Sequence, residues 1–71
     1  MPDTITQVGL VAGKIWHFIN DKGGEAALSV LLSSINHNQQ VVLMGLGWLA
    51  REGQVFLEEK DSDFKVVIKK L

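Results

Sequence analysis

The stretch from Gly47 to Val55, GWLAREGQV, joins a helical pattern directly to a strand pattern, and this junction restricts the fold more than any other part of the chain. Gly53 stands just past the last helical residue, where a left-handed backbone conformation is wanted and glycine adopts it without steric cost. An alternating strand pattern begins at Gln54. A helix that ends on glycine and runs straight into a strand predicts that this helix feeds a β-hairpin.

The last third of the chain supplies both strands of that hairpin. Residues 54–59 and 64–71 have strand patterns. Between them, Asp61-Ser62-Asp63 provides residues that are typical of turns. We therefore expect a two-stranded wing at the C-terminal end.

A first amphipathic helix is predicted from about Ile5 to Lys22. Thr4 and Gln7 have the spacing of a capping box at its start, and Gly23-Gly24 closes its other end. Its apolar side chains fall on one broad side, which we expect to face the core: Ile5, Val8, Val11, Ala12, Ile15, Trp16, Phe18 and Ile19.

Two features of this helix predict its packing. Trp16 is expected to be a buried anchor against the third helix. Gly9 and Gly13 have GxxxG spacing, which in lipid is a helix dimer motif, but the polar residues of this helix rule out a membrane span. We expect instead that a neighbouring element packs closely against these glycines.

The middle of the chain permits two interpretations. Helix propensity alone would begin a second helix at Glu25, whereas Ser29 could cap a shorter helix that runs to Ile35 and leave residues 26–28 as a brief strand. The order of elements favours the second interpretation. A turn at Asn36-His37-Asn38 then leads into a third helix that begins near Gln39.

The third helix has two apolar groups. The group expected to face the core contains Val42, Leu43, Leu46, Leu49 and Ala50. The second group, Val41, Met44 and Trp48, lies on the opposite side. Either this helix is buried around more than half of its circumference, or the second group belongs to a protein interface, where Trp and Met are enriched. Gly45 weakens the helix and predicts close packing at that position.

The predicted elements are a helix, a short strand, two helices and a two-stranded wing, an α+β arrangement that fills one winged helix-turn-helix domain over residues 1–71. Two motifs support this fold: AGKIW at Ala12–Trp16 and GWLAREG at Gly47–Gly53. In this order they resemble a small prokaryotic winged helix-turn-helix family of unsettled function. The resemblance spans nearly the whole chain and implies the fold, but it implies no activity.

Composition indicates a chain that gains from a partner. A domain of 71 residues buries only roughly 60% of the surface that its unfolded chain exposes. The hydrophobic share is 46%, and with the seven glycines it exceeds the ~45–50% that is usual for this enlarged set. The formal net charge of −1 provides no long-range attraction to polyanions.

Targeting and redox features point to the cytoplasm. The chain has no cysteine, so neither a disulfide framework nor a thiolate metal site is expected. Its start lacks a basic segment leading into an apolar one, and no apolar run approaches the ~20 residues of a membrane span. We therefore expect a cytoplasmic protein.

Catalysis is not expected, and no cofactor or metal is predicted. His17 and His37 lie on different elements, without an adjacent acid or thiol. Glu58 and Glu59 alternate to opposite sides of a strand and cannot form a carboxylate pair. The glycines do not form a phosphate-binding loop.

DNA binding is the inference that the fold class alone suggests, because the start of the third helix would enter the major groove. Asn and Gln side chains can bind adenine there. The candidate DNA contacts are His37, Asn38, Gln39, Gln40 and Lys65. Phosphate would repel the acidic wing tip, which contains Glu58, Glu59, Asp61 and Asp63.

The sequence therefore predicts a small binding module that acts through protein contacts as a homodimer, with Val41, Met44 and Trp48 as the candidate interface. The alternative is a DNA-binding transcriptional regulator that uses the start of the third helix and the wing.

Overall fold

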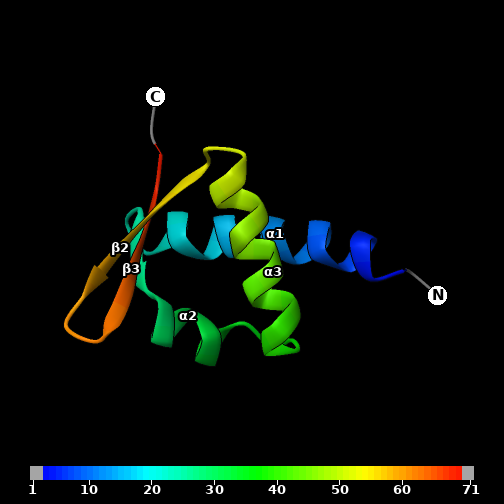
Figure 1. Cartoon of the computed structure of the whole chain (residues 1–71), viewed down its shortest axis with the longest axis horizontal. Coiled ribbons are helices and arrows are strands. Elements are labelled where there is room, and N and C mark those ends of the chain that lie inside the picture. The colour runs from blue at the N-terminus through cyan, green and yellow to red at the C-terminus, as the bar shows by residue number, and fades with distance from the viewer. Residues whose placement is uncertain (1–2, 70–71) are drawn as a thin grey trace.

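Three helices and three strands succeed one another in the predicted order in the computed structural model, which describes residues 3–69. The elements are α1 (Thr4–Asp21), β1 (Glu25–Ala27), α2 (Leu28–Ser34), α3 (Gln39–Arg51), β2 (Val55–Lys60) and β3 (Asp63–Ile68). In Figure 1, α3 crosses α1 while the strands lie beside the helices. The predicted α+β winged-helix arrangement is confirmed. Residues 70 and 71, which we expected to continue the last strand, lie outside the described residues.

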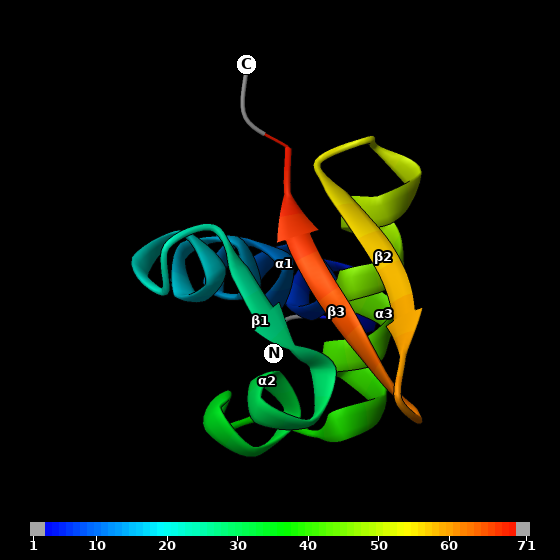
Figure 2. The ribbon, with the colours of Figure 1, turned by 90° about the vertical axis from the view of Figure 1, so that its left-hand side faces the viewer.

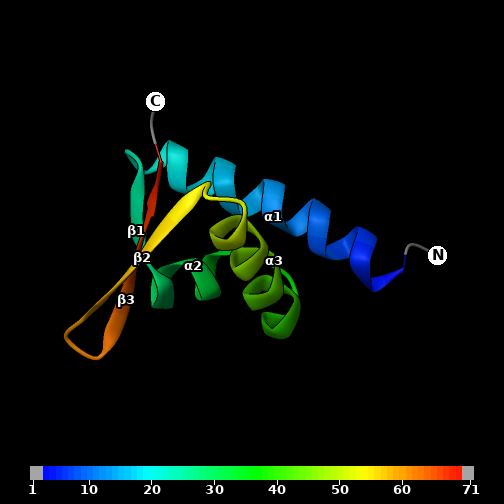
Figure 3. The same ribbon diagram turned by 45° about the horizontal axis from the view of Figure 1, so that its top comes forward.

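The three strands form one antiparallel sheet in the order β1-β3-β2. Ala26 lies opposite Val66 in the first pair of strands, and Leu57 lies opposite Val66 in the second. Figure 2 shows this sheet with α1 and α3 behind it, so one face of the sheet covers the helices and the other faces outward. The wing tip projects away from the helices, as Figure 3 shows.

A single core lies between the helices and the inner face of the sheet. Every element except β1 contributes a buried apolar side chain to it: Val11, Ala12, Ile15, Ile19, Leu31, Val42, Leu46, Leu49, Val55, Val66 and Ile68. Among the described residues, no buried side chain is polar or charged. Apolar burial is therefore what holds the layers together.

Helices α1 and α3 approach each other closely at Gly45, the position where the sequence predicted close packing. A Cβ placed on Gly45 would lie 3.2 Å from the backbone nitrogen of Ala12 and 3.3 Å from the carbonyl oxygen of Val8. Both neighbours are backbone atoms of α1, so they cannot move aside as a side-chain end could. The absence of a side chain at this position lets the two helices meet along their backbones.

Several predictions about α1 are wrong. Asp3, not Thr4, caps the helix, because its carboxylate accepts a 2.7 Å hydrogen bond from the Thr6 amide. Gly9 and Gly13 face open space, because α3 approaches α1 on another side. Trp16 is only partly buried and packs at the margin of the core, whose fully enclosed α1 residues include Ile15 and Ile19.

Ile5 and Leu43 were also predicted to face the core, but both side chains are exposed. Ile5 lies in the first turn of α1, and Leu43 lies at the edge of α3 that faces the wing. Amphipathic periodicity identifies a side of a helix, but it does not say how far along that side the neighbouring elements extend.

The interpretation with a short strand before α2 is confirmed, although the strand is Glu25–Ala27 rather than residues 26–28. It exists because β3 pairs with it, a long-range contact that local helix propensity cannot anticipate. Ser29 does not cap α2. Its hydroxyl donates a 2.7 Å hydrogen bond to the Asp63 carboxylate on β3, which ties α2 to the base of the wing turn.

The Gly53 reversal follows the sequence prediction, whereas the wing turn is shorter than predicted, because Lys60 and Asp63 already pair as strand residues. Gly53 has φ +73°, and the Gln54 amide donates a 2.8 Å hydrogen bond to the Leu49 carbonyl oxygen. At the wing tip, Asp61 and Ser62 both have positive φ, which is the geometry of a two-residue hairpin turn. The end of α3 thus determines where β2 starts, and the tight tip pairs β2 with β3 without a bulge.

The contact at Gly45 predicts opposite effects for two glycines of α3. Gly45→Val is expected to lower the free energy of unfolding by about 1–3 kcal/mol, because its side chain must push α1 away. Gly47→Ala is the matched control: nothing lies within 4 Å of its Cβ position. The control is expected to raise stability by up to about 1 kcal/mol through helix propensity. Urea denaturation measures both, and a Gly45→Val variant as stable as the parent would contradict the close contact.

The link between Asp63 and Ser29 predicts a pH dependence. Hydrogen bonds from the Ser29 hydroxyl and the Phe64 amide lower the pKa of Asp63 below its ordinary value. A lowered native pKa stabilises the fold fully above the unfolded-state pKa of about 3.9, and this contribution is lost as the pH falls through the native pKa. The stability lost in Asp63→Asn should therefore be constant near neutral pH and shrink below about pH 4.

Asp61→Asn is the control for that measurement, because Asn accepts the left-handed conformation and removes the same charge without touching Ser29. The free energy of unfolding, measured by urea denaturation at a series of pH values, distinguishes the two variants. Equal pH profiles for both would show that the link to Ser29 contributes nothing.

Candidate functional site

The outer face of α3, on the side away from the core, is apolar and open to solvent. We define it as Val41, Leu43, Met44, Gly47 and Trp48. The exposed fractions are 46% for Leu43, 52% for Met44 and 54% for Trp48, while Val41 is partly buried. The interpretation in which Trp48 is a core residue is therefore wrong. The inner face of the same helix, with Val42, Leu46 and Leu49, already fills the core.

An apolar groove of about 200 Å³ continues the outer face of α3 toward the wing. It is lined by Leu28, Leu43, Leu46, Gly47, Leu57 and Phe64. Leu57 and Phe64 lie on the inner face of the hairpin, but the strands extend past the helices toward the tip. Their exposed fractions are 47% and 41%. Together, the outer face of α3 and this groove form a continuous apolar surface between helix and wing.

The sequence pattern does not reveal that Leu43, Leu57 and Phe64 lie at the surface. Leu57 and Phe64 share the inner face with Val55 and Val66, which are buried, so alternation alone places all four in the core. Their distance from the helices decides the difference. The signal that could have revealed them is the small number of helical side chains available to cover a hairpin whose two strands have six residues each.

Two of the polar residues at the start of α3, His37 and Asn38, accept hydrogen bonds from backbone amides at this helix end. The side-chain oxygen of Asn38 accepts hydrogen bonds from the backbone amides of Gln40 at 2.7 Å and Val41 at 3.3 Å. The Nδ1 atom of His37 accepts one from the Asn38 amide at 2.9 Å. These contacts satisfy amides at a helix start, which have no partner within the helix. Gln39 and Gln40 are exposed.

Lys65, the remaining candidate DNA contact, lies on a different face of the molecule. Its ammonium group forms a 2.9 Å ion pair with Glu25 on the outer face of the sheet. Glu25 and, to a smaller extent, Glu58 raise the pKa of Lys65 above its ordinary value. Lys65 thus lies on the outer face of the sheet rather than beside the start of α3, and the five candidate residues do not form one surface.

The wing is acidic where a DNA-binding wing would meet phosphate. Glu58, Glu59 and Asp61 are exposed, and Lys60 is the only cation between them. Asp63 is partly exposed and binds Ser29. In the part of the chain that the structure describes, the pair of Lys65 and Glu25 is the only ion pair. Glu58 lies opposite Lys65 in the hairpin, whereas Glu59 and Asp61 form no ion pair within residues 3–69.

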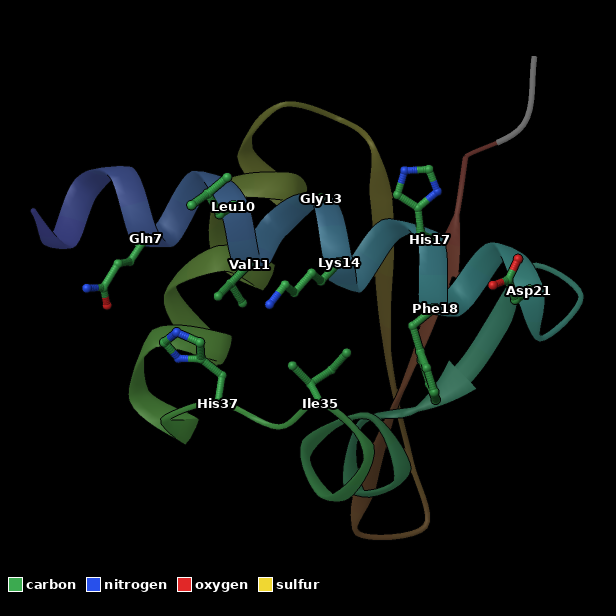
Figure 4. Close-up of a pocket in the computed structure, with 10 residues that line it drawn as sticks. All are labelled: Gln7, Leu10, Val11, Gly13, Lys14, His17, Phe18, Asp21, Ile35 and His37. Atoms are coloured by element: carbon green, nitrogen blue, oxygen red, sulfur yellow. The ribbon is translucent and has the colours of Figure 1, made fainter. Parts of the chain in front are cut away.

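A second, wider groove of about 700 Å³ runs between α1 and the segment that joins α2 to α3 (Figure 4). Lys14 points toward this segment and Phe18 toward α2, whereas His17 points away from His37. The two histidines therefore do not face each other across this groove. Within residues 3–69, no group of three or more His, Asp or Glu side chains is placed to hold a metal ion.

No helix among the described residues is both long and apolar enough to cross a membrane.

Comparison with known proteins agrees with the fold. A family model described as a winged helix-turn-helix domain (DUF2582) matches residues 1–68, from before α1 to the end of β3. The uncharacterized protein MJ1608 from Methanocaldococcus jannaschii is 36% identical over 72 residues, which cover 97% of this chain and all of that protein. The resemblance drawn from the two tryptophan motifs is thereby confirmed, and this chain belongs to the DUF2582 family of winged helix-turn-helix domains.

Proposed function

We propose that this domain is a protein-binding module that works as a homodimer, and that the outer face of α3 is its contact surface. The observation that carries the proposal is the exposure of three large apolar side chains, Leu43, Met44 and Trp48, on one side of one helix. Apolar surface grouped in this way is typical of interaction sites on soluble domains. A two-fold contact would bury it against the same surface of a second copy.

The chemistry of this helix face favours protein over DNA. In a helix-turn-helix domain the exposed side of this helix contacts base edges and phosphates, which present hydrogen-bonding groups and negative charge. Here the middle of that side offers Met44, Gly47 and Trp48, with Gln40 and Arg51 at its two ends. Met and Trp, together with Arg, are the residue types that protein interfaces favour.

DNA binding remains the second candidate, supported by the exposed amides of Gln39 and Gln40 at the start of α3. The acidic wing tip and the ion-paired Lys65 oppose it. A domain that contacts DNA only through neutral amides would lack the counterion release that supplies most non-specific affinity.

Met44→Asp is expected to convert the homodimer into a folded monomer, because a carboxylate would be desolvated in an apolar contact. Met44 is the best probe, since more than half of its surface is exposed in the single copy and its loss leaves the core intact. Sedimentation equilibrium measures the change in mass. Gln39→Asp is the matched control, because it adds the same charge to an exposed position at the start of the same helix.

A parent protein that is monomeric at high concentration would overturn the homodimer. If Met44→Asp unfolds while Gln39→Asp does not, Met44 contributes to the fold, and the outer face of α3 is not a free surface.

Duplex DNA is expected to bind weakly, with a plot of log affinity against log salt no steeper than about −2, because few cations are free to contact phosphates. An NMR titration of the labelled domain with mixed-sequence duplex at several salt concentrations measures this. Tight binding at physiological salt, with amide shifts at residues 37–40, would support the regulator instead.

A further inference from the structure

Strand β2 is an edge strand that nothing in the described chain covers on its outer side. The sheet order β1-β3-β2 pairs β2 with β3 only. Its pairing with β3 runs without a bulge from Val55 to Lys60, and the strand contains no proline. Phe56 is 57% exposed and Leu57 is 47% exposed. A regular edge with apolar side chains offers free backbone groups to another strand.

We propose that the second copy pairs with this edge, so that the two β2 strands lie antiparallel and the two sheets join into one of six strands. This inference rests on the proposed homodimer and specifies its geometry. Strand addition would satisfy the free amides and carbonyls of both edges with backbone hydrogen bonds. A two-fold axis perpendicular to the sheet relates the copies, which places the helices of both on the same side.

The register follows from the faces of the strand and its charges. Residues that lie directly opposite each other in an antiparallel pair have side chains on the same face of the sheet. The two-fold axis must therefore pass beside one residue that pairs with the same residue of the second copy. An axis at Glu58 would place two carboxylates directly opposite each other. An axis at Phe56 would leave Glu59 and Lys60 of each copy without a strand partner, because they would extend past Gln54 of the other copy. An axis at Leu57 pairs every residue from Gln54 to Lys60 and places Leu57 against its own copy.

Charge complementarity supports the axis at Leu57. In that register Glu59 of the second copy lies opposite Val55, on the face of the sheet that carries α3. Val55 follows the end of α3 closely, where the exposed Arg51 stands. Neither Arg51 nor Glu59 forms an ion pair within residues 3–69. By symmetry, the dimer would contain this pair of opposite charges twice.

The same arrangement explains why the outer face of α3 is apolar. In Figure 2, α3 lies behind β2, at the same margin of the molecule as the free edge. Joining the two β2 edges therefore brings the α3 helices of both copies together beneath the extended sheet. Met44 and Trp48 of the two copies would then be buried between the helices, while the backbone ladder holds the register.

Cysteine cross-linking tests the register directly, because the chain has no cysteine of its own. Residues that pair with themselves across an antiparallel ladder have Cα atoms about 4.5–5.5 Å apart, which suits a disulfide. Residues one position from the axis are roughly 8 Å from their own copies, which is too far. Leu57→Cys is therefore expected to form an intermolecular disulfide under mild oxidation, whereas Phe56→Cys and Glu58→Cys are not.

Leu10→Cys is the control for random collision, since it is exposed on α1, away from β2. If the protein is a dimer but Leu57→Cys cross-links no faster than Leu10→Cys, the edge pairing is wrong while the homodimer stands. Fastest cross-linking at position 56 or 58 would overturn the register. A monomeric parent would overturn both the homodimer and this inference.

A charge exchange and a measurement on the parent protein complete the test. Arg51→Glu and Glu59→Arg, taken singly, are expected to raise the dimer Kd by roughly threefold to thirtyfold, and the double variant should recover most of that loss. In the parent, hydrogen exchange of the outward β2 amides should slow as protein concentration rises. Exchange that is independent of concentration in a dimeric sample would contradict strand pairing.

Discussion

The backbone contact between α1 and α3 at Gly45 is the constraint on which the rest of the structure depends. Because α3 lies directly against the Ala12 turn of α1, its Val42, Leu46 and Leu49 side chains reach the core. The end of α3 then determines where Gly53 reverses the chain and where β2 begins. The sheet closes over the core only because this helix is held so close to α1.

That contact also explains why a second apolar surface remains. In a domain of this size, one helix, one sheet and a short second helix cannot enclose α3 completely. The helix therefore has an inner face that stabilises the fold and an outer face that the single chain leaves in water. The groove between α3 and the wing has the same origin, since the hairpin is longer than the helical layer that it covers. A second copy joined at the β2 edge would cover both surfaces together.

The fold has the parts that a DNA-binding domain uses, but their chemistry differs. The polar residues before α3 are engaged in capping: Asn38 binds two amides of the helix, and His37 binds the amide of Asn38. At the wing tip, the exposed carboxylates of Glu58, Glu59 and Asp61 surround a single cation, Lys60. The helix face between these regions is apolar. These features support the proposal that the winged-helix architecture is used here for protein contact. In such a contact, the burial of Met and Trp side chains is favourable, and negative charge at the wing is tolerated.

The sequence alone determined the three helices, the Gly53 reversal and the wing turn, because each depends on the backbone preferences of a few neighbouring residues; Gly45 signalled a close contact, but the sequence did not say with which segment. Tertiary structure decided what those preferences leave open. It formed β1 by pairing with β3, turned Ser29 from a helix cap into a partner of Asp63, and left Leu43, Leu57 and Phe64 exposed although their periodicity matched buried neighbours. Periodicity gives the direction of a side chain, but burial depends on whether a distant segment reaches that position, and the distance between segments is a property of the whole packed chain.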